Sequence, residues 1–243
     1  MNYLLGPLTV NQLEHFELCW DNTDLTTLTT LNAEILLTSY KDERFCQAVS
    51  GKGAKISVDG QWIMFALNRK YGKLNIAKNS GSDLIYSVAE QCHSDGKKLL
   101  LLGGAIDTNN SAVKKLREHV GGNESIFGYS PPFSKYPFSL EFSGAIEEKV
   151  RQIRPHVIIT AFGVPKQEYW SLENGGLLEE CGVRYVLFFG GAIDMVAGKY
   201  KRAPGILTKL GLEGIYRLIL QPSRIRRYYK LLKLIPMIVF NRL

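Results

Sequence analysis

Short apolar runs alternate along this chain with longer segments in which apolar and polar residues recur at helical spacing. The short runs are rich in Leu, Val, Ile, Thr and aromatic residues and predict strands at residues 25–31, 55–58, 98–102, 125–129, 157–161 and 183–189. The amphipathic segments predict helices at residues 33–40, 62–71, 82–94, 111–119, 140–154 and 166–173. This alternation is typical of α/β proteins, so the sequence predicts a Rossmann-like, doubly wound, mainly parallel sheet with helices on both faces.

The pattern changes near residue 198, after which no further strand is predicted. Three short helical segments, at residues 205–212, 214–221 and 223–234, are separated by Gly and Pro. We therefore expect an α/β domain over residues 1–198 and a helical C-terminal appendage over residues 199–243. The appendage holds eleven Lys or Arg and a single acidic residue, whereas the whole 243-residue chain has a net charge of +7. The basicity thus belongs to the appendage.

The four cysteines, Cys19, Cys46, Cys92 and Cys181, are scattered singly and lack the close spacing of metal ligands. The first residues lack the basic and long apolar regions of a secretory signal. These features predict reduced thiols and a cytoplasmic protein. Residues 234–240 form the longest apolar stretch near the end, well short of the ~20 residues of a membrane-spanning helix.

Glycines follow several predicted strands, and the sequence Gly-Gly-Ala-Ile-Asp occurs twice, at residues 103–107 and 190–194. Ligands of open α/β sheets bind at the carboxyl edge of the strands, where these turns lie. Paired glycines let the backbone approach a ligand, and amide groups at the next helix attract phosphate. Ordinary strand-to-helix turns explain the same residues. The candidates for ligand contact are Gly103, Gly104, Gly163, Gly190 and Gly191, together with Asp194, which suits either ribose hydroxyls or a helix cap.

Asp59 follows the strand at residues 55–58 and precedes Gly60, which places its carboxylate at the carboxyl end of that strand. A carboxylate there can take the proton of an attacking hydroxyl as a general base. Asp-Gly is also a common turn pair and Asp a common helix cap, and the residues alone favour that interpretation. Thr30 and Asn32 end an earlier strand and point the same way, so both can reach one ligand. Asn32 is also a candidate helix cap.

Three motifs resemble the signature of the WecG/TagA/CpsF glycosyltransferases: Gly-x-Pro-Lys-Gln-Glu at residues 163–168, Gly-Gly-x-x-Asp at 190–194 and Gly-Lys-x-x-Arg-Ala-Pro at 198–204. The resemblance extends from about Thr30 to the C-terminus. It implies that Asp59 is the catalytic base and that Thr30 and Asn32 hold the nucleotide sugar. Members of the family often carry an arginine three residues before a Gly-Ser-Asp motif, whereas this chain has Lys78 there. Lysine keeps the charge but loses bidentate geometry.

Release of a diphosphate leaving group requires a metal ion or fixed donors and cations. The chain has no Asp-x-Asp motif and its four histidines are widely spaced, so we expect no metal site and no cofactor. Lys166, Gln167, Arg202 and the amides of the glycine turns are the candidate substitutes. With the resemblance, these observations assign Asp59, Thr30 and Gln167 to catalysis, and Asn32, Lys78, Lys166, Asp194, Arg202 and the glycines to substrate binding.

The resemblance implies an inverting transfer of N-acetylmannosamine, its uronic acid or glucose in cell-surface polysaccharide biosynthesis. The donor would be a UDP-sugar and the acceptor a polyprenyl-diphosphate-linked saccharide. In the appendage, Arg224, Arg226, Arg227 and Lys230 are interleaved with apolar and aromatic residues, a pattern that suits an anionic membrane surface. Nucleic-acid binding and simple packing are the alternatives for this segment. Because the family's acceptors are lipid-linked, we expect a peripheral protein at the cytoplasmic face of the bacterial inner membrane, without nucleic acid.

Two other functions stay open at this point. The doubly wound pattern alone also suits a nucleotide-binding oxidoreductase, although the chain has no Gly-x-Gly-x-x-Gly fingerprint. The basic appendage alone also suits a non-catalytic, membrane-attached scaffold. Fold class does not decide among these functions, so the choice depends on how the candidate residues are arranged in space.

Overall fold

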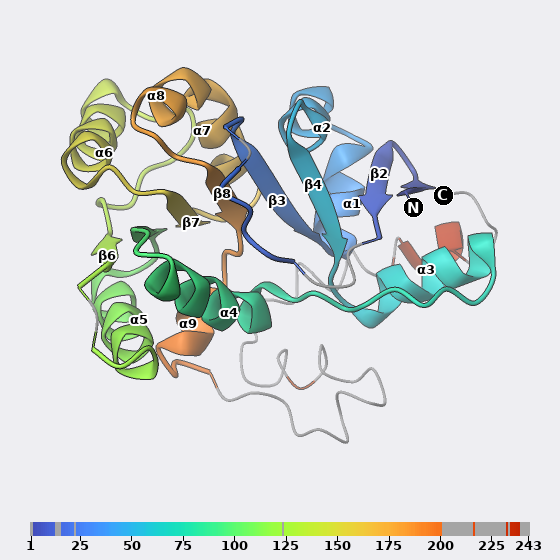
Figure 1. Ribbon diagram of the computed structural model, residues 1–243. Coiled ribbons are helices and arrows are strands. Elements are labelled where there is room, and N and C mark those ends of the chain that lie inside the picture. The colour runs from blue at the N-terminus through green and yellow to red at the C-terminus, as the bar shows by residue number, and fades with distance from the viewer. Residues whose placement is uncertain are drawn as a thin grey trace.

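The computed structural model describes residues 2–12, 16–21, 23–122, 124–200, 216, 232 and 234–238. A six-stranded, all-parallel sheet runs through it in the order β4-β3-β8-β7-β5-β6 (Figure 1). The strands are β3 (Thr26–Leu31), β4 (Ala54–Val58), β5 (Leu99–Gly103), β6 (Ile126–Tyr129), β7 (Val157–Ala161) and β8 (Tyr185–Phe188). All six predicted strands are present, and the predicted α/β class is confirmed.

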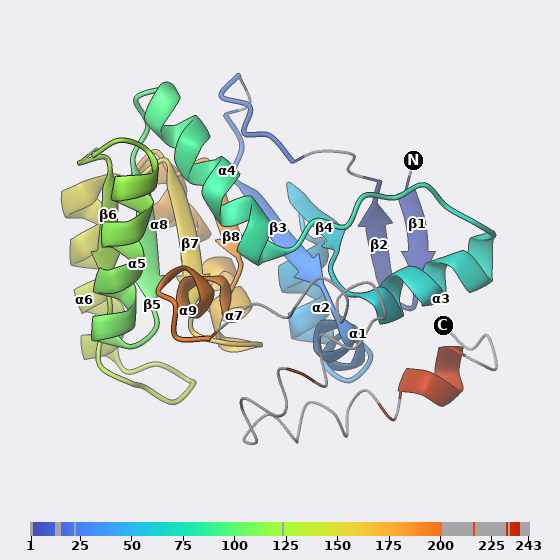
Figure 2. The same cartoon turned by 90° about the horizontal axis from the view of Figure 1, so that it is seen from below.

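Helices cover both faces of this sheet (Figures 1 and 2). One face packs against α4 (Gly81–Ser94), α5 (Ile106–His119) and α9 (Ala192–Val196) through strand residues such as Leu99 and Leu101. The other face packs against α6 (Leu140–Ile153), α7 (Lys166–Glu173) and α8 (Gly175–Glu180) through residues such as Leu100 and Leu102. Successive residues of a strand therefore enter opposite apolar layers, which is why these strands read as continuous apolar runs.

A third apolar cluster lies beside β4, at one edge of the sheet. It joins α1 (Ala33–Ser39), α2 (Glu43–Ser50) and α3 (Gln61–Tyr71) to an antiparallel hairpin of β1 (Asn2–Leu5) and β2 (Leu8–Asn11). Leu234 and Ile238, from the last described segment, are buried in the same cluster. Arg69 of α3 donates a hydrogen bond from Nε to the carbonyl of Ile238 at 3.1 Å, so the C-terminal segment packs on α3.

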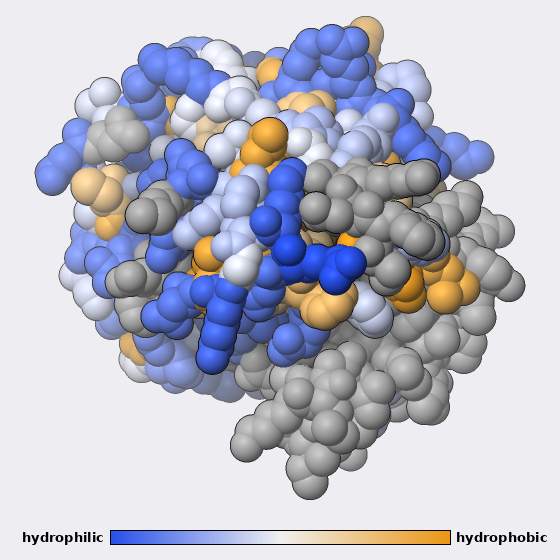
Figure 3. All heavy atoms as spheres, turned by 90° about the vertical axis from the view of Figure 1, so that its right-hand side faces the viewer, coloured by the Kyte–Doolittle hydropathy of each residue, from blue (hydrophilic) through white to orange (hydrophobic). Residues whose placement is uncertain are grey.

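Four features were not predicted: the β1–β2 hairpin, α2, α8 and α9, and α5 begins at Ile106 rather than at residue 111. In the part of the chain that the structure describes, no helix combines the length and the apolar character needed to cross a bilayer. The surface on the side of the hairpin and α3 is mostly hydrophilic where it is described, with scattered hydrophobic areas (Figure 3).

The strands end together at one edge of the sheet, because the register pairs Leu31 with Val58 and Gly103 with Ala161. From β3 the chain continues to β4 on one side, while it reaches β8 from β7 on the other. The connections of β3 and β8 therefore diverge, although the two strands are neighbours. The carboxyl edge at such a switch point is where open α/β sheets bind ligands.

Candidate active site

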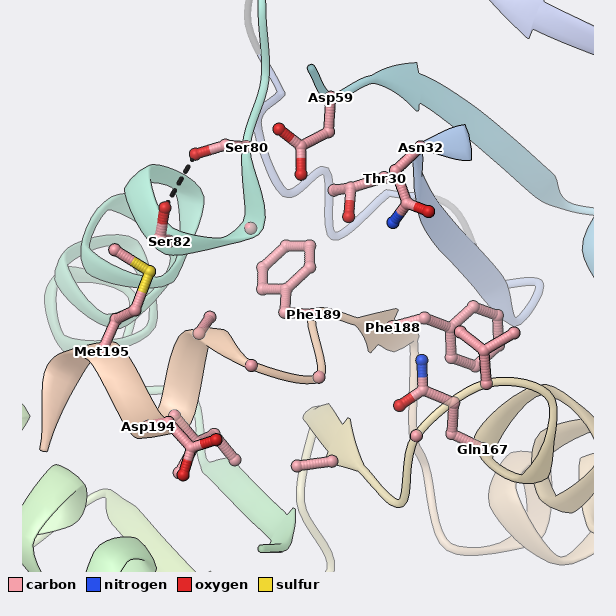
Figure 4. A pocket seen from close by; sticks show the side chains of 18 of the residues that line it. Thr30, Asn32, Asp59, Ser80, Ser82, Gln167, Phe188, Phe189, Asp194 and Met195 are labelled. Atoms are coloured by element: carbon pink, nitrogen blue, oxygen red, sulfur yellow. Dashed lines mark hydrogen bonds between the residues drawn. The ribbon is translucent and has the colours of Figure 1, made fainter. Parts of the chain in front are cut away.

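A cavity of about 370 Å³ lies at this carboxyl edge, a size typical of small-molecule sites (Figure 4). The ends of β3, β7 and β8, the residue after β4, and the first turns of α1, α4, α7 and α9 line it. The sequence candidates among its lining residues are Thr30, Asn32, Asp59, Gly104, Gly163, Gln167, Gly190, Gly191 and Asp194. Residues far apart in the sequence are thus brought to one place.

Asp59 is held at the edge of the sheet by its backbone. Its N–H donates to the carbonyl of Leu31 at 2.9 Å, which continues the β3–β4 pairing one residue beyond Val58. Gly60, rather than Asp59, is the N-cap residue of α3, and its φ of 98° is one that glycine adopts without strain. The half-buried carboxylate of Asp59 therefore points into the cavity, on the same side as Thr30 (Figure 4).

Asn32 combines both roles considered from the sequence. Its Oδ1 accepts hydrogen bonds from the N–H groups of Glu34 at 2.9 Å and Ile35 at 3.2 Å, so it caps α1. It also lines the cavity beside Thr30, which is buried, and Glu34 of the same helix turn lines it as well. Glu34 was not predicted, because a glutamate in a first helical turn reads as an ordinary favourable helix charge.

The wall opposite Thr30 comes from the first turn of α4, where Ser80 and Ser82 line the cavity. Ser80 Oγ donates to Asp83 Oδ2 at 2.8 Å and lies 2.9 Å from Ser82 Oγ (Figure 4). The N–H of Asn79 donates to the carbonyl of Val58 at 3.0 Å, which returns the long connection after α3 to the end of β4. The sequence reasoning missed both serines, since no periodicity reveals that return.

The glycine turns bring backbone to the cavity, but two of their N–H groups already donate hydrogen bonds within the protein. Gly190 N–H donates to the carbonyl of Thr160 at 3.0 Å, and Gly104 N–H donates to that of Ala161 at 3.3 Å. These two donors thus tie β8 and β5 to β7, which lies between them, instead of facing a phosphate. Gly103 does not line the cavity. A Cβ there would come within 2.9 Å of the ring of Phe162, so the glycine serves close packing instead.

Gln167 and Glu168 form a buried polar pair in the first turn of α7, with 2% and 0% of their surfaces exposed. Gln167 Nε2 donates to Glu168 Oε1 at 2.9 Å. Burial raises the pKa of Glu168 to about 7; the field of Glu34 adds to this rise, while the hydrogen bond from Gln167 opposes it. Glu168 belongs to the Pro-Lys-Gln-Glu motif, yet the sequence reasoning gave it no role.

Asp194 lines the cavity from α9 and lies 3.6 Å from the ammonium of Lys199, measured from Oδ1 to Nζ. Tyr200, next along the chain, also lines the cavity. Among the described lining residues the charged side chains are acidic, namely Glu34, Asp59 and Asp194.

Other predicted residues lie elsewhere. Lys166 Nζ donates to the carbonyl of Ser134 at 3.2 Å and sits 4.8 Å from the ring centre of Phe133, and burial lowers the pKa of Lys166. Lys78 is exposed and does not line the cavity. Arg202, Arg224, Arg226, Arg227 and Lys230 lie outside the described residues. Within the described ranges, no three side chains of His, Cys, Asp or Glu gather in a way that suits a metal ion.

A family model described as the glycosyl transferase WecG/TagA/CpsF family matches residues 5–243 of this chain. The match covers nearly the whole sequence, including the motifs at residues 163–168 and 190–194. The chain belongs to this family of glycosyltransferases, which act in polysaccharide biosynthesis and in general take a nucleotide-sugar donor and a lipid-linked acceptor.

Proposed function

We propose that this member of the WecG/TagA/CpsF family transfers a sugar from a UDP-sugar to a polyprenyl-diphosphate-linked saccharide, with inversion at the anomeric carbon. The placement of Asp59 carries the proposal: a half-buried carboxylate that directly follows β4 at the carboxyl edge of the sheet, directed into a cavity lined also by Thr30 and Asn32. A carboxylate so placed can receive the proton of an acceptor hydroxyl.

In the proposed reaction, Asp59 takes the proton of the acceptor hydroxyl while that oxygen bonds to the anomeric carbon of the donor. The bond between the anomeric carbon and the diphosphate oxygen breaks on the opposite face, and UDP leaves with the bonding electrons. An α-linked donor then gives a β-linked product. The sugar would be N-acetylmannosamine, its uronic acid or glucose.

The leaving diphosphate needs donors and positive charge. The first turn of α4 offers the positive end of a helix dipole, with Ser80 and Ser82 beside it at the cavity. The charged side chains among the described lining residues are acidic, so the positive charge has to come from elsewhere. We assign it to Arg202, which follows the lining residue Tyr200 by two positions in the sequence. Domain roles follow: residues 1–198 hold the nucleotide sugar, and residues 199–243 supply charge and membrane contact.

A panel of UDP-sugars, each tested with a short-chain lipid-diphosphate saccharide, tests the proposal directly. Release of UDP that depends on the acceptor identifies the enzyme and its sugar. Tight binding of NAD, without binding or turnover of any UDP-sugar, would favour the oxidoreductase alternative instead. Membrane binding with no turnover for any donor would favour a scaffold.

EDTA is expected to leave the transfer rate within about twofold of its starting value. The reason is that the sequence has no Asp-x-Asp motif to bridge a metal and the diphosphate, and helix donors and a cation can stabilise the leaving group instead. The measurement is UDP release before and after chelation. Loss of activity that magnesium or manganese restores would contradict it.

The basic appendage is expected to hold the protein on anionic membranes at the cytoplasmic face. Replacing Arg224, Arg226 and Arg227 with glutamate should release the full-length protein from vesicles that contain anionic lipid, because each reversal turns an attraction into a repulsion. Vesicle flotation measures this, and high salt should release the unmodified protein in the same way. Flotation that the triple variant retains would remove the membrane assignment.

A further inference from the structure

Among the described residues, the buried pair Gln167–Glu168 leaves the amide oxygen of Gln167 facing the cavity without a hydrogen-bond partner. Gln167 lines the cavity, and among the described residues neither its Oε1 nor Oε2 of Glu168 has a hydrogen-bond partner. Gln167 Oε1 lies beside the Gly190 turn, 3.9 Å from the position that a Cβ on Gly190 would take. Figure 4 shows the amide of Gln167 reaching into the cavity with this oxygen toward that turn. A buried acceptor in such a place is suited to a ligand that donates a hydrogen bond.

The neighbouring carboxylate explains why the oxygen, and not the nitrogen, is free. An amide presents donors at one end and an acceptor at the other, and an ionised carboxylate only accepts. Since Glu168 Oε1 takes a hydrogen from Gln167 Nε2, the amide is held with its nitrogen toward Glu168 and its oxygen toward the cavity. A diphosphate has only acceptors to offer at neutral pH, so it is the wrong partner for this oxygen.

We propose that Glu168 is a positioning residue that directs the carbonyl oxygen of Gln167 into the cavity, where it accepts a hydrogen bond from a hydroxyl or N–H group of the nucleotide sugar. The proposal rests on the proposed function. It replaces the role expected of Gln167 from the sequence, stabilising the leaving diphosphate, with recognition of a hydrogen-bond-donating group of the nucleotide sugar. Hydroxyls of the sugar and ribose and the N–H of the base or an N-acetyl group share this chemistry.

The pair has a built-in dependence on pH. Protonated Glu168 becomes a hydrogen-bond donor, and the side chain that contacts it is the amide of Gln167. Protonation therefore favours a turn of this amide that brings its oxygen to Glu168 and away from the ligand. Glu34 of α1 is the charged group that acts on Glu168 from a neighbouring element. On α7 itself, Lys166 is directed to Ser134 and the hydroxyl of Tyr169 donates to Asp42, so both face elsewhere. Ligand affinity therefore rises as the pH rises through about 7.

Calorimetric titration of the full-length protein with the accepted UDP-sugar at pH 6 and pH 8 tests the proposal. A UDP-sugar has no phosphate group that titrates in this range, so a change in affinity reports on the protein. The unmodified protein should bind severalfold more tightly at pH 8. Glu168→Gln should bind about three- to tenfold more weakly at pH 8, as expected for one lost hydrogen bond, and should lose the pH dependence. Ser171→Ala, also buried on α7, is the matched control and should keep both.

Gln167→Ala is the second variant, and it tests the same hydrogen bond to the ligand if Glu168→Gln does not fold. It should show the same loss at pH 8 and the same flat pH response. Titration with UDP at pH 8 locates the group that donates the hydrogen bond to Gln167. If the variant also binds UDP more weakly, the group is on the nucleoside; if only its affinity for the UDP-sugar falls, the group is on the sugar. Unchanged affinity and pH response in the folded variants would overturn the role of Glu168. A failure of the unmodified protein to bind any UDP-sugar would instead count against the proposed function.

Discussion

Replacing Asp59 with asparagine is expected to lower kcat at least ~100-fold while changing UDP affinity no more than severalfold. Asparagine keeps the size and shape of the side chain at the end of β4, but it cannot take up the proton of the acceptor hydroxyl. The backbone bond from Asp59 to Leu31 and the turn at Gly60 do not depend on the carboxylate. The rate measured with saturating donor and acceptor should therefore fall, whereas the affinity for UDP should change little.

Asp107→Asn is the matched control for this variant. Asp107 ends the first copy of Gly-Gly-Ala-Ile-Asp, is exposed and does not line the cavity, so its replacement should leave turnover near that of the unmodified protein. Circular dichroism and UDP titration establish that both variants are folded. Turnover of Asp59→Asn within a few-fold of normal would remove Asp59 from the proton-transfer step.

The inner strands β5, β7 and β8 were predictable because they are buried on both faces and therefore read as short apolar runs. The strands β3, β4 and β6 are less uniformly apolar, and their β-branched or aromatic residues indicated them. The hairpin at residues 2–11 has strands of four residues, and Leu4 is exposed while Leu8 and Val10 are buried, so it offers too short a pattern to detect. The helix α2 did have a readable start, since Asp42 accepts a hydrogen bond from the N–H of Phe45 as an N-cap.

Candidate residues at the end of a strand or directly after it do lie at the cavity. Thr30, Asn32 and Asp59 are examples, because parallel strands end at one edge whatever the order of the strands. Ser80 and Ser82 reach the same cavity through a long connection, which is held to the end of β4 by contacts such as the backbone hydrogen bond from Asn79 to Val58. Tertiary contacts of that kind leave no periodic trace in a sequence.

The two copies of Gly-Gly-Ala-Ile-Asp illustrate a second limit. The same five residues follow strands on either side of β7, yet Gly103 has a φ of 98° where Gly190 has 45°, and one aspartate is exposed while the other lines the cavity. The surroundings of the two turns also differ, since Phe162 fills the space beside Gly103 whereas Gln167 lies near Gly190. A short motif therefore predicted the turns but not which of their atoms face a ligand.

The folded state is expected to lose stability as the pH rises from about 4.5 to about 7, because of Glu168. Burial raises the pKa of this carboxyl to about 7 in the folded chain, against 4.5 for an ordinary glutamate. Between these values the folded chain binds a proton that the unfolded chain has released, so the free energy of unfolding falls as the pH rises. The full loss, above pH 7, is about 3 kcal/mol.

Glu168→Gln should abolish this loss, since glutamine stays neutral at every pH. Chemical unfolding at pH 5 and pH 8 should show that the variant gains about 2–3 kcal/mol relative to the unmodified protein between the two conditions. Glu179→Gln, at an exposed position on α8, is the control and should shift little. A variant with the same pH response as the unmodified protein would mean that Glu168 is ionised at little cost when folded. The carboxylate would then need a stronger partner than the amide of Gln167. The affinity for the UDP-sugar would also be the same at pH 6 and pH 8.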